Sequence, residues 1–154
     1  MSTGLDPLRT AIAVVALLVA GLHLYWGMPR YVGYTNLAII LQPDPRPIAF
    51  VVSGHLIVIG VTLGALRVIP VRPLYYGGIA LAITYLLGYV AWHTVLGHGA
   101  FWPWGPGGHV HGNGTVSIIV QHLLADRFDL LTKVLELVWL GLLIFALIRE
   151  DSVD

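Results

Sequence analysis

The sequence predicts an all-α, polytopic membrane protein, a four-transmembrane-helix bundle in one domain, residues 1–154. Two observations carry this prediction. Of the 154 residues, 57% are hydrophobic and only 10% are charged, whereas about a quarter are charged in a typical soluble domain. In addition, four long apolar stretches each approach the roughly 20 residues that a helix needs to cross a hydrocarbon core. These stretches are residues 8–27, 47–66, 73–97 and 128–148.

The first two spans are almost free of charge. Residues 8–27 carry only Arg9, at their start. Their histidine-bearing, aromatic end fits the cleavage region of a signal peptide poorly, so we expect a retained membrane helix. Residues 47–66 contain no charged residue. Pro47 suits the first turn of a helix, where the backbone N–H group has no partner within the helix.

The third span, residues 73–97, is also uncharged. Its short link to the second span predicts that these two helices are antiparallel neighbours. Tyr85, Tyr89 and His93 follow one another at i, i+4 and i+8, so they share one face of this helix.

The fourth span, residues 128–148, contains Lys133 and Glu136. Ionisable side chains within a bilayer are costly and usually have a partner or a task. The i, i+3 spacing of these two residues allows a local ion pair. The alternative is that Glu136 pairs with His55 as a proton-carrying or metal-ligating couple.

The longest connection, residues 98–114, is rich in Gly, Pro, Trp and His and contains no Lys, Arg, Asp or Glu. Residues 115–126 resemble a short amphipathic helix that lies at the membrane interface. The sequence therefore predicts a Gly/Trp/His-rich outer loop followed by an interfacial helix.

The overall composition excludes several function classes. Eight Lys and Arg residues balance eight Asp and Glu residues, so the basic face needed to bind nucleic acid is not expected. Cysteine is absent, which excludes disulfides, iron–sulfur clusters and thiol nucleophiles. The sequence contains neither an HExxH motif nor a phosphate-binding loop.

On the predicted topology all seven histidines lie in the same half of the membrane. They are His23, His55, His93, His98, His109, His111 and His122. With a rise of about 1.5 Å per helical residue, His23 and His93 would lie about 6 Å below the surface. His55 and Glu136 would lie deeper, at about 12 Å.

The shallow layer predicts a cofactor site. Two imidazoles at equal depth on different helices, His23 and His93, suit the axial ligation of haem b in an apolar slot between helices. Taken singly, each of these residues is more often an interfacial histidine bonded to a carbonyl group. We place His55 and Glu136 in the same cofactor-binding region.

A second site would use the histidines nearer the surface. Imidazole nitrogen suits transition metals such as Cu, Zn and Fe. The simplest alternative for the loop histidines is a solvated, glycine-rich segment. The candidate metal ligands are His98, His109, His111 and His122.

These observations predict a redox or electron-transfer protein that binds haem b or a transition metal. The alternatives are a non-catalytic accessory or structural subunit of a membrane complex, and a protein that translocates protons or ions. The expected partners are the lipid bilayer and either other membrane subunits or further copies of the chain.

The expected orientation in the cell membrane depends on the positively charged residues in short segments at the span ends. Four cations fall on each side: Arg9, Arg67, Arg72 and Arg149 on the side of the termini, and Arg30, Arg46, Arg127 and Lys133 on the other. The first set lies in short segments next to span ends, where the positive-inside bias acts most strongly. By the positive-inside rule the side of the termini faces the cytoplasm, and the histidine-rich side faces outward.

Overall fold

The computed structural model describes residues 6–33, 44–97 and 114–151, and all regular secondary structure within them is helical. Four helices are long and apolar enough to cross a membrane, by length and composition. A fifth, α5, is a short apolar helix. In chain order the helices are α1 (Pro7–Gly33), α3 (Arg46–Ala65), α4 (Val71–His93), α5 (Thr115–Ala125) and α6 (Arg127–Asp151). The predicted helical class and the four apolar helices are thus confirmed.

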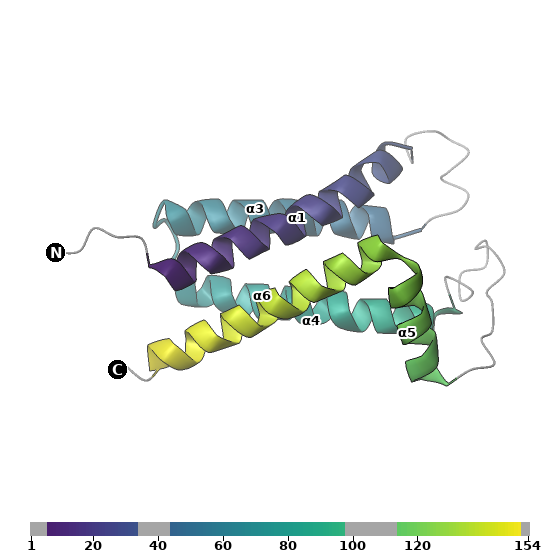
Figure 1. Cartoon of the computed structure of the whole chain (residues 1–154). Helices are drawn as coiled ribbons and strands as arrows, with labels where there is room; N and C mark the ends of the chain where they lie inside the picture. Colours follow the sequence, from purple (N-terminus) through teal and green to yellow (C-terminus); the bar gives the residue numbers. More distant parts are fainter. Residues whose placement is uncertain (1–5, 34–43, 98–113, 152–154) are drawn as a thin grey trace.

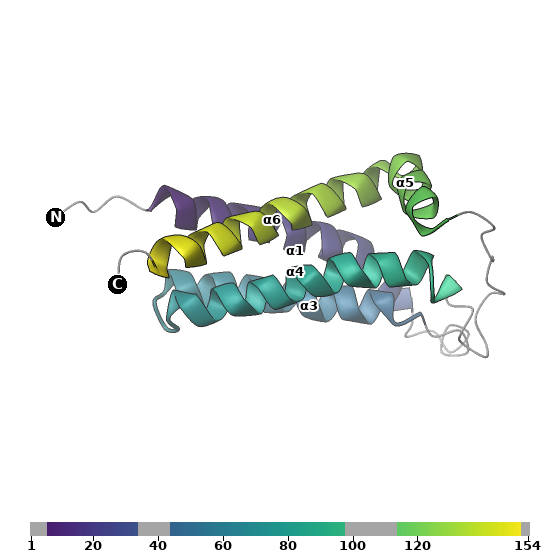
Figure 2. The same ribbon diagram turned by 90° about the horizontal axis from the view of Figure 1, so that it is seen from below.

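The four long helices lie side by side along a common direction (Figures 1 and 2). Helix α1 packs most extensively against α3, helix α4 against α6, and contacts between α1 and α6 join the two pairs. The start of α1 and the end of α6 lie at one end of the molecule, and α5 lies at the other (Figure 1). We call these the terminal end and the α5 end.

Two helices differ from the expected spans, and the differences change the depth of the histidines. Helix α1 continues through Pro29 to Gly33, six residues beyond the predicted boundary at Gly27. Helix α4 ends at His93 because Thr94 leaves the helical conformation, with φ −121° and ψ −90°. Hydropathy marks where the apolar run stops, whereas a helix continues until its backbone changes conformation.

Glycines allow close approach within both helix pairs. A Cβ atom placed on Gly54 of α3 would lie 2.8 Å from Cγ of Leu24 on α1. A Cβ atom on Gly78 of α4 would lie 2.9 Å from Cδ1 of Leu143 and 3.2 Å from Cζ2 of Trp139 on α6. Small residues at such crossings bring helix backbones together, which is the usual packing device in membranes.

The outer surface of the four long helices is as apolar as their interior. Large exposed side chains occur on each helix, among them Leu18, Leu56, Leu87 and Phe145. Such a continuous apolar surface suits contact with lipid tails rather than with water.

Candidate functional site

A buried contact between α1 and α6 forms the centre of the site. The imidazole Nε2 of His23 lies 3.1 Å from Oε1 of Glu136. The two side chains are 2% and 0% exposed. A carboxylate enclosed in this way needs partners within the protein, since the loss of hydration of a charged group is costly.

Lys133, one turn before Glu136, supplies the second partner. Its ammonium Nζ lies 2.6 Å from Oε2 of Glu136, and the Lys133 side chain is 12% exposed. The same Nζ lies 3.5 Å from the backbone oxygen of Tyr85 on α4. Both carboxylate oxygens of Glu136 therefore have a nitrogen partner. We refer to these residues as the His23–Glu136–Lys133 cluster.

Aromatic rings enclose the imidazole of His23. The ring of Phe50 is stacked on it at a centroid distance of 4.7 Å, and the ring of Tyr85 is tilted against it at 4.0 Å. Nδ1 of His23 and the hydroxyl of Tyr85 are buried without a hydrogen-bond partner. Unpaired buried polar atoms are rare in proteins. The hydroxyls of Tyr75 and Tyr89 and Nε1 of Trp139 are also buried without a partner among the described residues, but His23 is itself a member of the cluster and Tyr85 lies against its imidazole.

From the cluster, a line of aromatic and titratable groups leads to the α5 end. The ammonium of Lys133 lies 5.0 Å from the ring centroid of Tyr89. The rings of Tyr89 and His93 are 4.2 Å apart, and those of His93 and His122 are 4.5 Å apart. The i, i+4, i+8 spacing on α4 thus places Tyr85, Tyr89 and His93 along one line, and α5 adds His122.

Towards the terminal end the interior next to the cluster is mostly apolar, although Tyr75 is buried there and its hydroxyl has no hydrogen-bond partner among the described residues. Buried side chains from α1, α4 and α6 fill this part of the described structure. They include Ile12, Ala16, Val19, Ala82, Trp139 and Leu143. The titratable groups in ring contact with the cluster's neighbours, Tyr89, His93 and His122, lie towards the α5 end.

The structure corrects the expected pairing of His55 with Glu136. His55 is exposed on the outer side of α3, and its Nδ1 lies 2.7 Å from the carbonyl oxygen of Val51. The reason is helix rotation. Successive helical residues are about 100° apart, and it is Ser53, Gly54 and Ile57 that α3 buries.

The equal depth expected for His23 and His93 is also wrong. His23 lies ten residues before the end of α1, whereas His93 is the last residue of α4. His23 contacts Tyr85, which precedes His93 by eight residues, or about 12 Å of helix. The two imidazoles therefore do not lie at one depth in the structure, and the binding of haem remains a prediction.

The expected metal ligands divide into two groups. His98, His109 and His111 lie outside the described residues. His122 lies on α5 against His93, whose Nδ1 is 2.9 Å from the carbonyl oxygen of Tyr89. Among the described residues, no group of three or more His, Asp or Glu side chains is arranged to hold a metal ion. The metal site remains a prediction.

Sequence reasoning did not find His23 as the partner of Glu136, although a signal was present. Ala16, Ala20, His23 and Gly27 recur at helical spacing, and all four are buried. A histidine in a row of small residues lies on the face that approaches other helices closely. That row identifies His23 as an inward-facing residue.

Arginine and tryptophan side chains connect three helices at the α5 end. The guanidinium of Arg30 lies 4.1 Å from the ring centroid of Trp26. The guanidinium of Arg46 lies 5.4 Å from the same ring and 3.9 Å from that of Trp92. Asp44 pairs with Arg46 at 2.6 Å. Cation–π contacts of this kind join α1, α3 and α4.

Comparisons of the chain with protein-family models, curated proteins and solved structures gave no match. The fold and the site alone define the class. It is a helical protein with four helices that could span a membrane and a buried His–Glu–Lys cluster between them.

Proposed function

We propose that the protein is a four-transmembrane-helix bundle of the cell membrane, with the α5 end outward, and that it translocates protons through the His23–Glu136–Lys133 cluster. One observation carries the proposal. A fully buried carboxylate lies within an apolar helix and contacts both an imidazole and an ammonium group. Ionisable residues at such positions in membrane proteins commonly form proton relays.

The chemistry of the cluster supports this proposal. Imidazole and carboxylate can share a proton across the 3.1 Å contact, as imidazolium with carboxylate or as neutral imidazole with carboxylic acid. The second form lowers the number of buried charges, while the ammonium of Lys133 favours the first. The shared proton can therefore lie on His23 or on Glu136, and the exchange between these two forms requires no change in side-chain packing.

The side chains on the two sides of the cluster differ, and this difference gives the proposed proton movement a direction. Protons enter from the α5 end past His122, His93 and Tyr89, with water carrying them on to the cluster, because the Tyr89 hydroxyl has no hydrogen-bond partner among the described residues. Exit towards the terminal end requires the apolar side chains there to separate, so release is coupled to a helix movement. This is alternating access at a site between helices, a common arrangement in membrane transporters.

Proton flux in liposomes tests the proposal. The purified protein, reconstituted with a pH-sensitive dye inside the vesicles, should carry protons down an imposed gradient. Glu136→Gln should abolish this flux, whereas Glu150→Gln, at a partly exposed position near the end of α6, should leave it unchanged. Wild-type flux in Glu136→Gln would overturn the proposal.

A second variant guards against loss of folding. If Glu136→Gln does not fold, Lys133→Met provides the same test because it leaves the His23–Glu136 contact in place and removes only the ammonium. Thermal unfolding in detergent establishes that each variant is folded. A folded Lys133→Met with unchanged flux would show that the ammonium has no part in proton transfer.

A second candidate function is transition-metal binding with a redox role. It is favoured by the 4.5 Å contact between the rings of His93 and His122. An absorption spectrum with metal analysis of protein purified from its native membrane tests it. Stoichiometric copper or iron that is lost in His122→Ala would support this candidate, whereas zinc, which has no redox chemistry, would support metal binding alone. A preparation with neither metal nor a Soret band would contradict it, and a co-purifying polypeptide would then favour an accessory subunit.

A further inference from the structure

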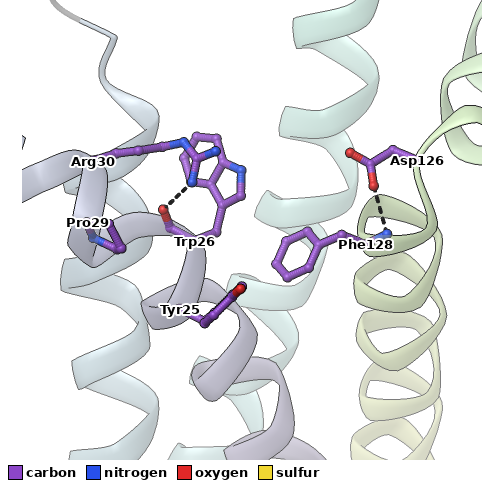
Figure 3. Close-up of a pocket in the computed structure, with 6 residues that line it drawn as sticks. All are labelled: Tyr25, Trp26, Pro29, Arg30, Asp126 and Phe128. Atoms are coloured by element: carbon purple, nitrogen blue, oxygen red, sulfur yellow. Dashed lines mark hydrogen bonds between the residues drawn. The ribbon is translucent and has the colours of Figure 1, made fainter.

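A pocket of about 450 Å³ opens at the α5 end, away from the His23–Glu136–Lys133 cluster. Figure 3 shows its two sides. One is the end of α1 and the other is the start of α6. Its lining consists of Tyr25, Trp26, Pro29, Arg30, Asp126 and Phe128. The volume lies within the range usual for small-molecule sites.

The two charged groups of the pocket lie on opposite sides (Figure 3). One nitrogen of the Arg30 guanidinium donates to the carbonyl oxygen of Trp26 at 2.8 Å. Oδ1 of Asp126 accepts a hydrogen bond from the backbone N–H of Phe128 at 2.8 Å. Among the described residues neither group is in an ion pair. A ligand with separated negative and positive charges complements this arrangement.

Aromatic rings line the space between the charges. The ring centroids of Tyr25 and Phe128 are 6.1 Å apart, and the guanidinium of Arg30 covers the ring of Trp26. Ring faces attract alkylated or primary ammonium groups. The positive charge of a ligand would therefore be favoured beside Asp126, where a carboxylate and an aromatic ring lie together.

We propose that this pocket binds the zwitterionic headgroup of a phospholipid, with its phosphate beside Arg30 and its ammonium group beside Asp126. The location supports a lipid as the source of that chemistry. Tyr25 is 75% exposed, and below it on the same face of α1 Gly21 has open space and Leu18 is exposed. Acyl chains can follow this face while the headgroup occupies the level of the interfacial aromatic residues.

The proposal depends on the membrane placement of the helices and not on proton transfer. Native mass spectrometry of the full chain in detergent tests it, with phosphatidylethanolamine and phosphatidylglycerol as probes. Both lipids carry a phosphate, but only the first carries an ammonium group. We expect phosphatidylethanolamine to bind about fivefold more tightly, the effect of one partly exposed charge contact. Equal affinity of the two lipids would overturn the assignment.

Two variants and one control assign the contacts. Asp126→Asn keeps an oxygen that can accept from the Phe128 N–H group, so α6 should start normally while the preference for phosphatidylethanolamine disappears. Arg30→Gln should weaken both lipids. Arg127→Gln removes a neighbouring cation that does not line the pocket, and it should change neither affinity. An unchanged preference in Asp126→Asn would contradict the proposal.

Soluble phosphoethanolamine distinguishes a lipid from a small solute that carries the same charges. It should compete with the lipid only weakly because it lacks acyl chains. If it displaced phosphatidylethanolamine with equal affinity, the pocket would be a solute site, and the lipid assignment would be wrong.

Discussion

The two halves of the four long helices contain different kinds of interior. Towards the α5 end the helices bury a histidine, a glutamate and most of a lysine, with tyrosines between them and the surface. Towards the terminal end they bury alanine, valine, isoleucine, leucine, tryptophan and one tyrosine, Tyr75, and the charges there form partly exposed pairs such as Arg9 with Glu150 at 3.2 Å. In a chain with few charged residues, their positions therefore say more about the interior of each half than their total count does.

The largest expected loss of stability comes from removing the Glu136 side chain at the centre of the polar half. Glu136→Ala leaves the Lys133 ammonium and the His23 imidazole without their partner in a buried position. Removing one member of a buried ion pair costs roughly 3–5 kcal/mol of stability. Unfolding of the purified protein in mixed micelles measures this cost. Glu150→Ala, the matched loss of a partly exposed carboxylate, should cost less than about 1 kcal/mol.

If Glu136→Ala and Glu150→Ala destabilised the protein equally, the burial of the Glu136 contacts would make no extra contribution to the free energy of unfolding. A cost for Glu136→Ala that vanished in the background of Lys133→Met would instead assign the whole effect to the unpaired ammonium.

The apolar half should be sensitive to volume rather than to charge. Gly78→Ala places a methyl group 2.9 Å from Cδ1 of Leu143, so α4 and α6 must separate or Leu143 must move. Overpacking of this kind costs about 1–3 kcal/mol. The adjacent Gly77 has nothing within 4 Å of an added Cβ atom, and Gly77→Ala should be neutral or stabilising. Equal effects of the two substitutions would contradict the packing of α4 against α6.

A further test of the polar half uses the hydroxyl of Tyr85, which is buried and has no hydrogen-bond partner among the described residues. Tyr85→Phe keeps the ring against His23 and removes only this hydroxyl. We expect the thermal midpoint to change by no more than a few degrees, since no hydrogen bond is lost. Proton flux should fall if the hydroxyl holds a proton or a water molecule beside the cluster. Unchanged flux would remove Tyr85 from the proposed path.

The smallest expected effect is at the terminal end. Arg9→Gln removes the contact with Glu150, in which both side chains are partly exposed. Such pairs contribute about 0–1 kcal/mol, and less at high salt. A loss of stability comparable to that of Glu136→Ala would show that this end is less accessible to water than its exposure indicates.

Much of the fold follows from composition because a membrane limits the possible structures. Four long, mostly apolar runs allow little besides four helices, and the short run that begins at Thr115 forms α5. The helix ends were less predictable. The continuation of α1 past Pro29 and the end of α4 at His93 depend on local backbone conformation rather than on hydropathy.

The partners within the site were harder to predict than the helices. The spacing of Lys133 and Glu136 indicated their contact, which the structure confirms. Depth along the helix suggested His55 as a further partner, but depth ignores the direction in which a side chain points. His23 shares a helix face with Ala16, Ala20 and Gly27. The residues at i±3 and i±4 from His55 are Val51, Val52, Val58 and Ile59. This difference separates the inward histidine from the outward one.

The most direct test of the account uses the infrared carboxyl band of Glu136, identified by its loss in Glu136→Gln. The protein is reconstituted in vesicles with a known orientation, and the pH is changed on one side at a time. The account predicts that the band responds within the mixing time to pH on the α5 side and only slowly to pH on the terminal side. A response of equal speed from both sides, or a response to the terminal side alone, would contradict a buried proton site that opens towards α5.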